Sequence, residues 1–154
     1  MNRDVIAVAS DHAGVELKSL LKEELVKAGY AFVDLGTNGP ESVDYPDYAD
    51  AMAVAIRSGQ AKRGVLVCGS GIGISIAANR HRELRAALCH DVTSARMARL
   101  HNDANVIAFG ARFIGSEVAK DCLTAFLTTP FEGGRHARRV AKLTPPHQDR
   151  ENND

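Results

Sequence analysis

Residues 67–80 read VCGSGIGISIAANR, and in this stretch three glycines follow an apolar run that ends in Cys68. The run has the composition of a buried parallel strand, and the residues after Gly73 have helical spacing. A strand that turns through glycines into a helix is typical of a βα unit, whose turn lies at the carboxyl edge of a parallel sheet. The stretch therefore predicts an α/β fold with a ligand-binding turn at that edge.

Strand and helix patterns alternate on both sides of this turn. Short apolar runs predict strands at Val5–Ala9, Ala31–Leu35, Val65–Cys68, Ala86–Cys89 and Val106–Phe109. Apolar residues spaced by three and four positions predict helices that end before Gly29 and Gly59, and further helices at about Asp91 to His101, Ser116 to Thr128 and Arg135 to Leu143. We therefore predict a doubly wound α/β sandwich, with a five-stranded parallel sheet covered by helices on both faces.

Length and composition restrict the class of protein. The 154 residues suffice for one domain, which we assign to residues 1–144, while the polar residues 145–154 predict a disordered tail. Because 19 basic and 19 acidic residues balance to a formal charge of zero, we expect no nucleic-acid partner and no membrane partner. The N-terminus lacks an apolar stretch of signal-peptide or membrane-spanning length, which predicts a cytoplasmic protein.

Cysteine and histidine spacing argues against disulfide and metal chemistry. Cys68, Cys89 and Cys122 are odd in number and lack CxxC spacing, so we predict free thiols. The six histidines show neither HxH nor HExxH spacing, and no carboxylate cluster accompanies them. The sequence therefore predicts a protein without a metal ion or other cofactor.

The glycine turn predicts an anion site, and its spacing excludes two familiar loops and matches a third only weakly. Glycines let a ligand approach the backbone, and the N–H groups that open the next helix point at it. A mononucleotide loop needs a lysine after the glycines, and none follows them here. A dinucleotide turn follows the first strand with GxGxxG, whereas this turn follows the third predicted strand with GxGxG, so the match is weak. A cysteine-phosphatase loop would need an arginine six residues beyond Cys68, where Ile74 stands.

Cys68 has two interpretations. A cysteine at the end of a buried strand is most simply a small apolar core residue. A thiol just before a helix N-terminus is instead surrounded by N–H groups that favour the thiolate, and we expect such a thiol to be partly exposed. Cys89 and Cys122 lack this setting and are predicted to be packing residues.

Four other stretches gather polar residues that the predicted fold does not require. They are SDHAG at 10–14, DYPDYA at 44–49, RLHNDAN at 99–105 and EGGRHARR at 132–139. Each also has a purely structural interpretation: Asp11 as a helix cap, Tyr45 as a half-buried aromatic residue, His101 as a cation at a helix end, and the arginines as a solvated face. Their joint presence with the glycine turn indicates a common site.

Over about residues 4–143 the chain resembles the type B ribose-5-phosphate isomerase family, which includes related allose- and galactose-phosphate isomerases. The resemblance is carried, in order, by the motifs VASDHAG, DLGT, DYPDYA, VCGSGIGISIAANR, RLHNDANVIAFGAR and EGGRHARRV. The resemblance implies a Rossmann-like three-layer α/β/α sandwich, no metal, and a homodimer or a dimer of dimers. It also implies an intramolecular oxidoreductase of the pentose phosphate pathway, which interconverts ribose 5-phosphate and ribulose 5-phosphate through an enediolate.

The resemblance also implies roles by position. Cys68 is the base that moves a proton between C1 and C2, and His101 opens the sugar ring. Ser70, where many members with this cysteine have threonine, keeps the catalytic hydroxyl. The residues expected to bind sugar and phosphate are Asp11, His12, Tyr45, Gly69, Ser70, Gly71, Ile72, Gly73, Asn102, Arg112, Arg135 and Arg139. Members without the cysteine base use a glutamate where this chain has Ile74, so Cys68 is the remaining candidate.

This chemistry fits the residue types independently of the resemblance. Removing a proton beside a sugar carbonyl leaves an oxyanion, and fixed N–H donors commonly stabilise such a charge by about 3–4 kcal/mol each. Arg135 and Arg139, spaced i, i+4, can hold a phosphate as a handle that orients the reacting end.

Chain direction predicts that two chains share each site. Every connecting helix starts at the carboxyl edge, where Cys68 lies, and runs back to the opposite edge. His101, at the end of a helix of about ten residues, should therefore lie roughly 15 Å away, and Arg135 and Arg139 follow another such helix. A two-fold dimer would pair the carboxyl edge of one chain with the amino edge of the other.

Two alternatives stay open. A non-catalytic module that senses a sugar phosphate or a nucleotide would use the glycine turn and the arginines, but it has no use for a tuned thiol. An isomerase of allose 6-phosphate, galactose 6-phosphate or erythrose 4-phosphate would differ from a ribose enzyme mainly in the depth of its pocket.

Overall fold

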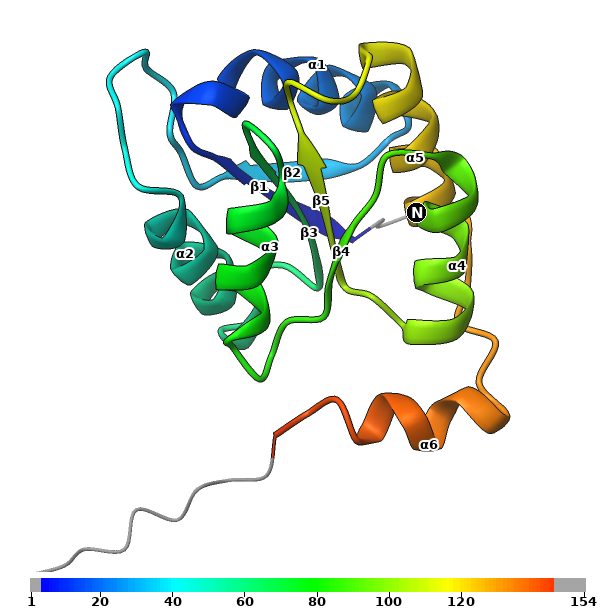
Figure 1. Cartoon of the computed structure of the whole chain (residues 1–154). Coiled ribbons are helices and arrows are strands. Elements are labelled where there is room, and N and C mark those ends of the chain that lie inside the picture. Colours follow the sequence, from blue (N-terminus) through cyan, green and yellow to red (C-terminus); the bar gives the residue numbers. More distant parts are fainter. Residues whose placement is uncertain (1–3, 146–154) are drawn as a thin grey trace, which may run out of the picture.

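A computed structural model describes residues 4–145, and the predicted tail, apart from Pro145, lies outside these residues. Five parallel strands form a sheet in the order β2-β1-β3-β5-β4 (Figure 1). The strands are β1 (Val5–Ser10), β2 (Ala31–Asp34), β3 (Arg63–Cys68), β4 (Ala86–Leu88) and β5 (Val106–Gly110). The helices are α1 (Val15–Lys27), α2 (Tyr45–Arg57), α3 (Ile72–Asn79), α4 (Val92–Asn102), α5 (Ser116–Thr128) and α6 (Arg135–Ala141), with a 3-10 turn at His12–Gly14. The predicted fold class is confirmed.

Strand residues alternate between two apolar layers, as the pleat of a strand requires. Ile6 and Val8 of β1 belong to the cluster that includes the buried faces of α1, α4 and α5. Ala7 and Ala9 face the other way, toward α2 and α3. Figure 1 shows these two helix layers on opposite sides of the sheet. Because the central strands are buried on both faces, their sequences read as short, continuous apolar runs.

The handedness of the connections creates the crevice in which a site can form. From β1 the chain moves to β2 through α1, and from β3 it moves the opposite way across the sheet through α3. Right-handed crossovers in opposite directions place their helices on opposite faces. Since β1 and β3 are neighbours, α1 and α3 diverge where these strands end. In open α/β sheets this is the position where ligands bind.

The cysteines and the helix lengths bear on two expectations from the sequence. Cys68, Cys89 and Cys122 are all free and buried, so the prediction of free thiols is confirmed. Among residues 4–145, no helix has both the length and the apolar character needed to cross a membrane.

Lys18 of α1 is a buried cation whose hydrogen bonds hold the loop after β2 in place. Its side chain is only 1% exposed, and its Nζ donates to Asp34 Oδ1 at 2.7 Å, to Asn38 Oδ1 at 3.0 Å and to the Thr37 carbonyl. Burial lowers the pKa of Lys18, while its hydrogen bond to Asp34 acts in the opposite direction. The same loop leads into α2, so Lys18 fixes the approach to the crevice.

We expect Lys18→Met to lower the free energy of unfolding by about 3 kcal/mol, because it removes one partner of a buried ion pair. Lys22 offers a matched control, since its Nζ also contacts Asp34, at 2.9 Å, but is 25% exposed. Lys22→Met should cost less than about 1 kcal/mol. Urea unfolding followed by circular dichroism measures both values, and equal losses would show that Lys18 has no special role.

Candidate active site

The carboxyl ends of β1 and β3 bring Asp11 and Cys68 to one edge of the sheet, as predicted. Ser10 lies opposite Val67 in the parallel register, and the Asp11 N–H donates to the Val67 carbonyl at 3.2 Å. One oxygen of Asp11 caps the 3-10 turn by accepting from the N–H groups of Ala13 at 3.0 Å and Gly14 at 3.2 Å. Asp11 therefore has the structural role of a cap that the sequence allowed, and it lies at the same edge of the sheet as Cys68.

The thiol of Cys68 lies inside the glycine turn. Its Sγ accepts the N–H of Gly71 at 3.1 Å, so an amide hydrogen points at the sulfur. The side chain is 3% exposed, and the expectation of a partly exposed thiol is therefore wrong for this chain. The reason is that Cys68 points to the α2 and α3 side of the sheet, where it packs in the same cluster as Ile74.

Gly71 is required by the shape of the turn. Its φ of +73° lies in the left-handed region that side chains rarely adopt. A Cβ at this position would lie 2.7 Å from the carbonyl carbon of Phe109 and 2.8 Å from the nitrogen of Gly110. Because both contacts are with the backbone of β5, the turn cannot easily move away from them.

Tyr45 and Arg112 approach the turn from two further elements. A Cβ on Gly73 would lie 2.5 Å from Cζ of Tyr45, which shows that the aromatic ring packs directly on the glycine backbone. A Cβ on Gly69 would lie 3.1 Å from a guanidinium nitrogen of Arg112. The hydroxyl of Ser70 accepts the N–H of Ile72 at 3.2 Å, which stabilises the start of α3.

His12 completes the group at this edge. Its Nδ1 accepts the N–H of Val43 at 3.2 Å, so in the neutral ring the proton lies on Nε2. His12 also lines a surface cavity of about 370 Å³ together with Asn38 and Gly39. The loop held by Lys18 therefore forms one wall of this cavity, beside His12.

The remaining predicted site residues lie at the other end of the molecule. α4 runs back from the carboxyl edge and ends with His101 and Asn102, and α6, which carries Arg135 and Arg139, lies beyond the amino edge (Figure 1). Val92–Asn102 has 11 residues, which corresponds to a rise of about 16 Å. The structure therefore divides the predicted site into a carboxyl-edge group and an amino-edge group.

Glu132 and His136 belong to the amino-edge group and were not predicted. The rings of His101 and His136 stack with centroids 4.3 Å apart and an angle of 15°. Burial and the neighbouring His101 lower the pKa of His136. The sequence held a signal for this pair, because Glu132 and His136 have the same i, i+4 spacing as Arg135 and Arg139.

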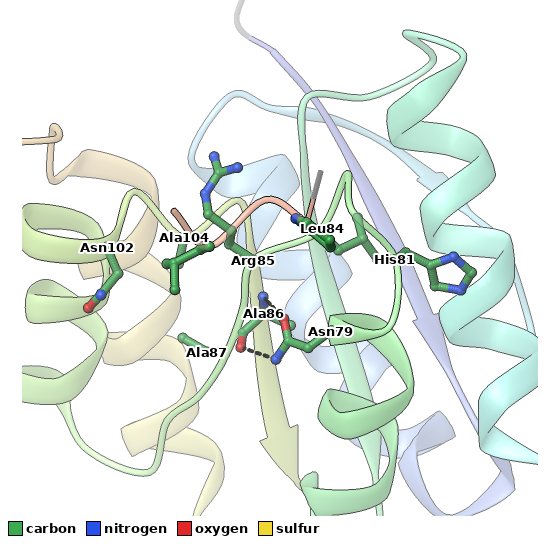
Figure 2. Close-up of a pocket in the computed structure, with 10 residues that line it drawn as sticks. Asn79, His81, Leu84, Arg85, Ala86, Ala87, Asn102 and Ala104 are labelled. Carbon is green, nitrogen blue, oxygen red and sulfur yellow. Dashed lines mark hydrogen bonds between the residues drawn. The ribbon is translucent and has the colours of Figure 1, made fainter. Parts of the chain in front are cut away.

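A cavity of about 390 Å³ opens beside the amino-edge group (Figure 2). It lies between the end of α3, the start of β4 and the end of α4, and Asn102 is the predicted site residue in its wall. Figure 2 shows the Asn79 amide paired with the backbone of Ala86, with bonds of 2.9 and 2.8 Å. Cys68 does not line this cavity, so the cavity belongs to the amino edge alone.

Comparisons with known proteins agree on one family. The family model described as Ribose/Galactose Isomerase matches residues 6–143. Ribose-5-phosphate isomerase B of Escherichia coli K12 is 45% identical over 145 residues, which cover 94% of this chain and 97% of that protein. D-erythrulose-4-phosphate isomerase of Pectobacterium atrosepticum is 44% identical over 139 residues, with coverages of 90% and 91%. The crystal structure of a ribose 5-phosphate isomerase from Thermotoga maritima has a TM-score of 0.90 and 50% identity, covering 92% of this chain and 98% of that chain.

The geometry of the turn predicts that Gly71→Ala is strongly destabilising. The substitution combines left-handed strain with a backbone clash, and we expect a loss of about 3 kcal/mol or more. Gly59 is a matched control because its φ is +80° and a Cβ there would have no neighbour within 4 Å. Gly59→Ala should cost about 1 kcal/mol. Denaturant unfolding of both variants measures the difference, and similar losses would contradict the clash.

Proposed function

The chain belongs to the ribose/galactose isomerase family, and on this premise we propose that it interconverts ribose 5-phosphate and ribulose 5-phosphate through an enediolate, without a metal ion. It is an aldose–ketose isomerase, as its relatives are. The observation that carries the proposal is the Cys68 thiol, held at the end of β3 inside a glycine turn. A base beside an oxyanion site needs this position at the turn, and the thiol, which is 3% exposed, must become accessible to the sugar for the reaction.

In the proposed reaction, the sulfur of Cys68 takes the proton from C2 of the open-chain aldose. The electrons of the C–H bond move into the carbonyl and leave negative charge on O1, beside the N–H groups of the turn. Return of the proton to C1, with transfer of the O2 proton to O1, gives the ketose. Ser70 follows two residues after Cys68 and supplies a hydroxyl to the same oxygens.

We assign ring opening and phosphate binding to the amino-edge group of a second chain. His101 would act on the ring oxygen, while Asn102, Arg135 and Arg139 would hold the sugar and its phosphate. An exposed apolar patch beside the turn supports such an assembly, because Ile76 of α3 is 64% exposed and lines a surface cavity with Tyr45 and Pro46. Exposed apolar patches of this kind are typical of interfaces. The homodimer and the cytoplasmic location stay predictions.

A four-carbon sugar phosphate is the second candidate substrate. A relative named D-erythrulose-4-phosphate isomerase is nearly as similar to this chain as one named ribose-5-phosphate isomerase B, at 44% against 45% identity. The same thiol and turn would serve both substrates, because the chemistry takes place at C1 and C2. A non-catalytic sensor is disfavoured, since it would have no use for a thiol at this position.

The test is to incubate the protein with ribose 5-phosphate, erythrose 4-phosphate, allose 6-phosphate and galactose 6-phosphate and to measure each ketose. We expect the highest kcat/KM for ribose 5-phosphate, unchanged by EDTA. Cys68→Ala should lower kcat by at least about 100-fold, the range for a lost general base, while sugar phosphate still binds. Cys89→Ala, which also removes a buried thiol, should keep wild-type turnover. More than a few per cent of wild-type turnover in Cys68→Ala would rule out Cys68 as the base.

A further inference from the structure

His101 converges with two side chains that are distant from it in sequence, Glu132 and His136, where α4 meets the start of α6. Nε2 of His101 lies 3.8 Å from one carboxylate oxygen of Glu132, and Nε2 of His136 lies 3.9 Å from the other. One ligand atom from each residue lies within 4.8 Å of the other two. The backbone holds this arrangement, because the Glu132 N–H donates to the carbonyl of Leu100, next to His101, at 3.1 Å.

His136 gives an independent sign that this cluster lacks a partner. The residue is 6% exposed, and its buried Nε2 has no hydrogen-bond partner among the residues that the structure describes. A buried imidazole nitrogen without a partner is costly, and most buried polar atoms are satisfied. The same nitrogen faces Glu132, so an ion bound by both the imidazole nitrogen and the carboxylate would satisfy the nitrogen and remove this cost.

We propose that His101, Glu132 and His136 form a binding site for a divalent transition-metal ion, with Zn²⁺ as the best match, and that the bound ion inhibits the isomerase. Two imidazoles and one carboxylate are a familiar zinc donor set that leaves a fourth position open. Ligand atoms around tetrahedral zinc lie about 3.4 Å apart. Closing the separations of 3.8 and 3.9 Å needs a small movement of the half-exposed Glu132 side chain. The stacked imidazoles, which lie at 15° to each other, must also turn so that both Nε2 lone pairs point at one ion.

Inhibition follows from the identity of one ligand, and this part of the proposal rests on the proposed function. A metal-bound His101 cannot exchange a proton with the sugar ring through the same nitrogen. The ion is therefore an inhibitor that competes with catalysis, and the isomerase reaction itself needs no metal. Arg135 and Arg139 on α6 add positive charge nearby, so we expect weaker binding than at a closed structural zinc site.

Metal binding is tested first without substrate. Co²⁺ absorption and Zn²⁺ calorimetry of the full chain should report one site per chain. Glu132→Gln removes a ligand at a half-exposed position where folding is not at risk, and it should weaken binding at least about 10–100-fold, as should His136→Ala. The control Glu117→Gln removes an 84% exposed carboxylate and should leave the affinity unchanged. Unchanged affinity in both ligand variants would overturn the site.

Inhibition is tested separately, as the ratio of rates with and without Zn²⁺ for each protein. We expect Zn²⁺ to inhibit the wild type reversibly, EDTA to restore the rate, and Glu132→Gln to resist inhibition. Wild-type and Cys68→Ala proteins must bind Co²⁺ with equal affinity, and neither may show a thiolate charge-transfer band, which shows that the ion is not on the sulfur. Binding at the cluster without inhibition would overturn the inhibitory role. Absence of isomerase activity would instead count against the proposed function and leave the binding result intact.

Discussion

The right-handedness of the strand-helix-strand connections is the constraint on which the carboxyl-edge group depends. It places α1 and α3 on opposite faces of the sheet and so opens the edge between β1 and β3. Asp11 and Cys68 occupy this edge because they are the first residue after β1 and the last residue of β3. The tight turn that follows is possible only because Gly71 accepts a left-handed conformation against the backbone of β5.

The same constraint separates the two halves of the proposed site. In a parallel sheet every helix must return to the amino edge before the next strand begins, so residues at the ends of helices lie far from residues at the ends of strands. His101 is at the end of α4, and Arg139 lies on α6 beyond that edge. The proposed function needs both groups at one sugar and therefore requires two chains, and we propose that the exposed Ile76 beside the turn lies in their contact.

The sequence was sufficient for features that depend on local patterns. The strands, the glycine turn and the limits of α5 follow from apolar runs, from glycine positions and from Pro130 beyond the helix end, and the structure reproduces them. Features that depend on side chains distant in sequence were not predicted. Cys68 is buried because it points to the α2 and α3 side of the sheet and packs in the same cluster as Ile74, and His136 meets His101 only through the packing of α6 on α4. Lys18 was overlooked although it lies on the apolar stripe of α1, three residues before Leu21.

The central claim, that one chain supplies Cys68 and its partner supplies His101, is tested most directly by mixing two inactive proteins. Cys68→Ala and His101→Ala chains, separately tagged, are co-expressed and the doubly tagged dimers are assayed. In a mixed dimer one site carries both lesions and the other carries neither, so a purified mixed dimer should regain about half of wild-type activity. Doubly tagged dimers that remain inactive would show that Cys68 and His101 act within one chain, which contradicts the account.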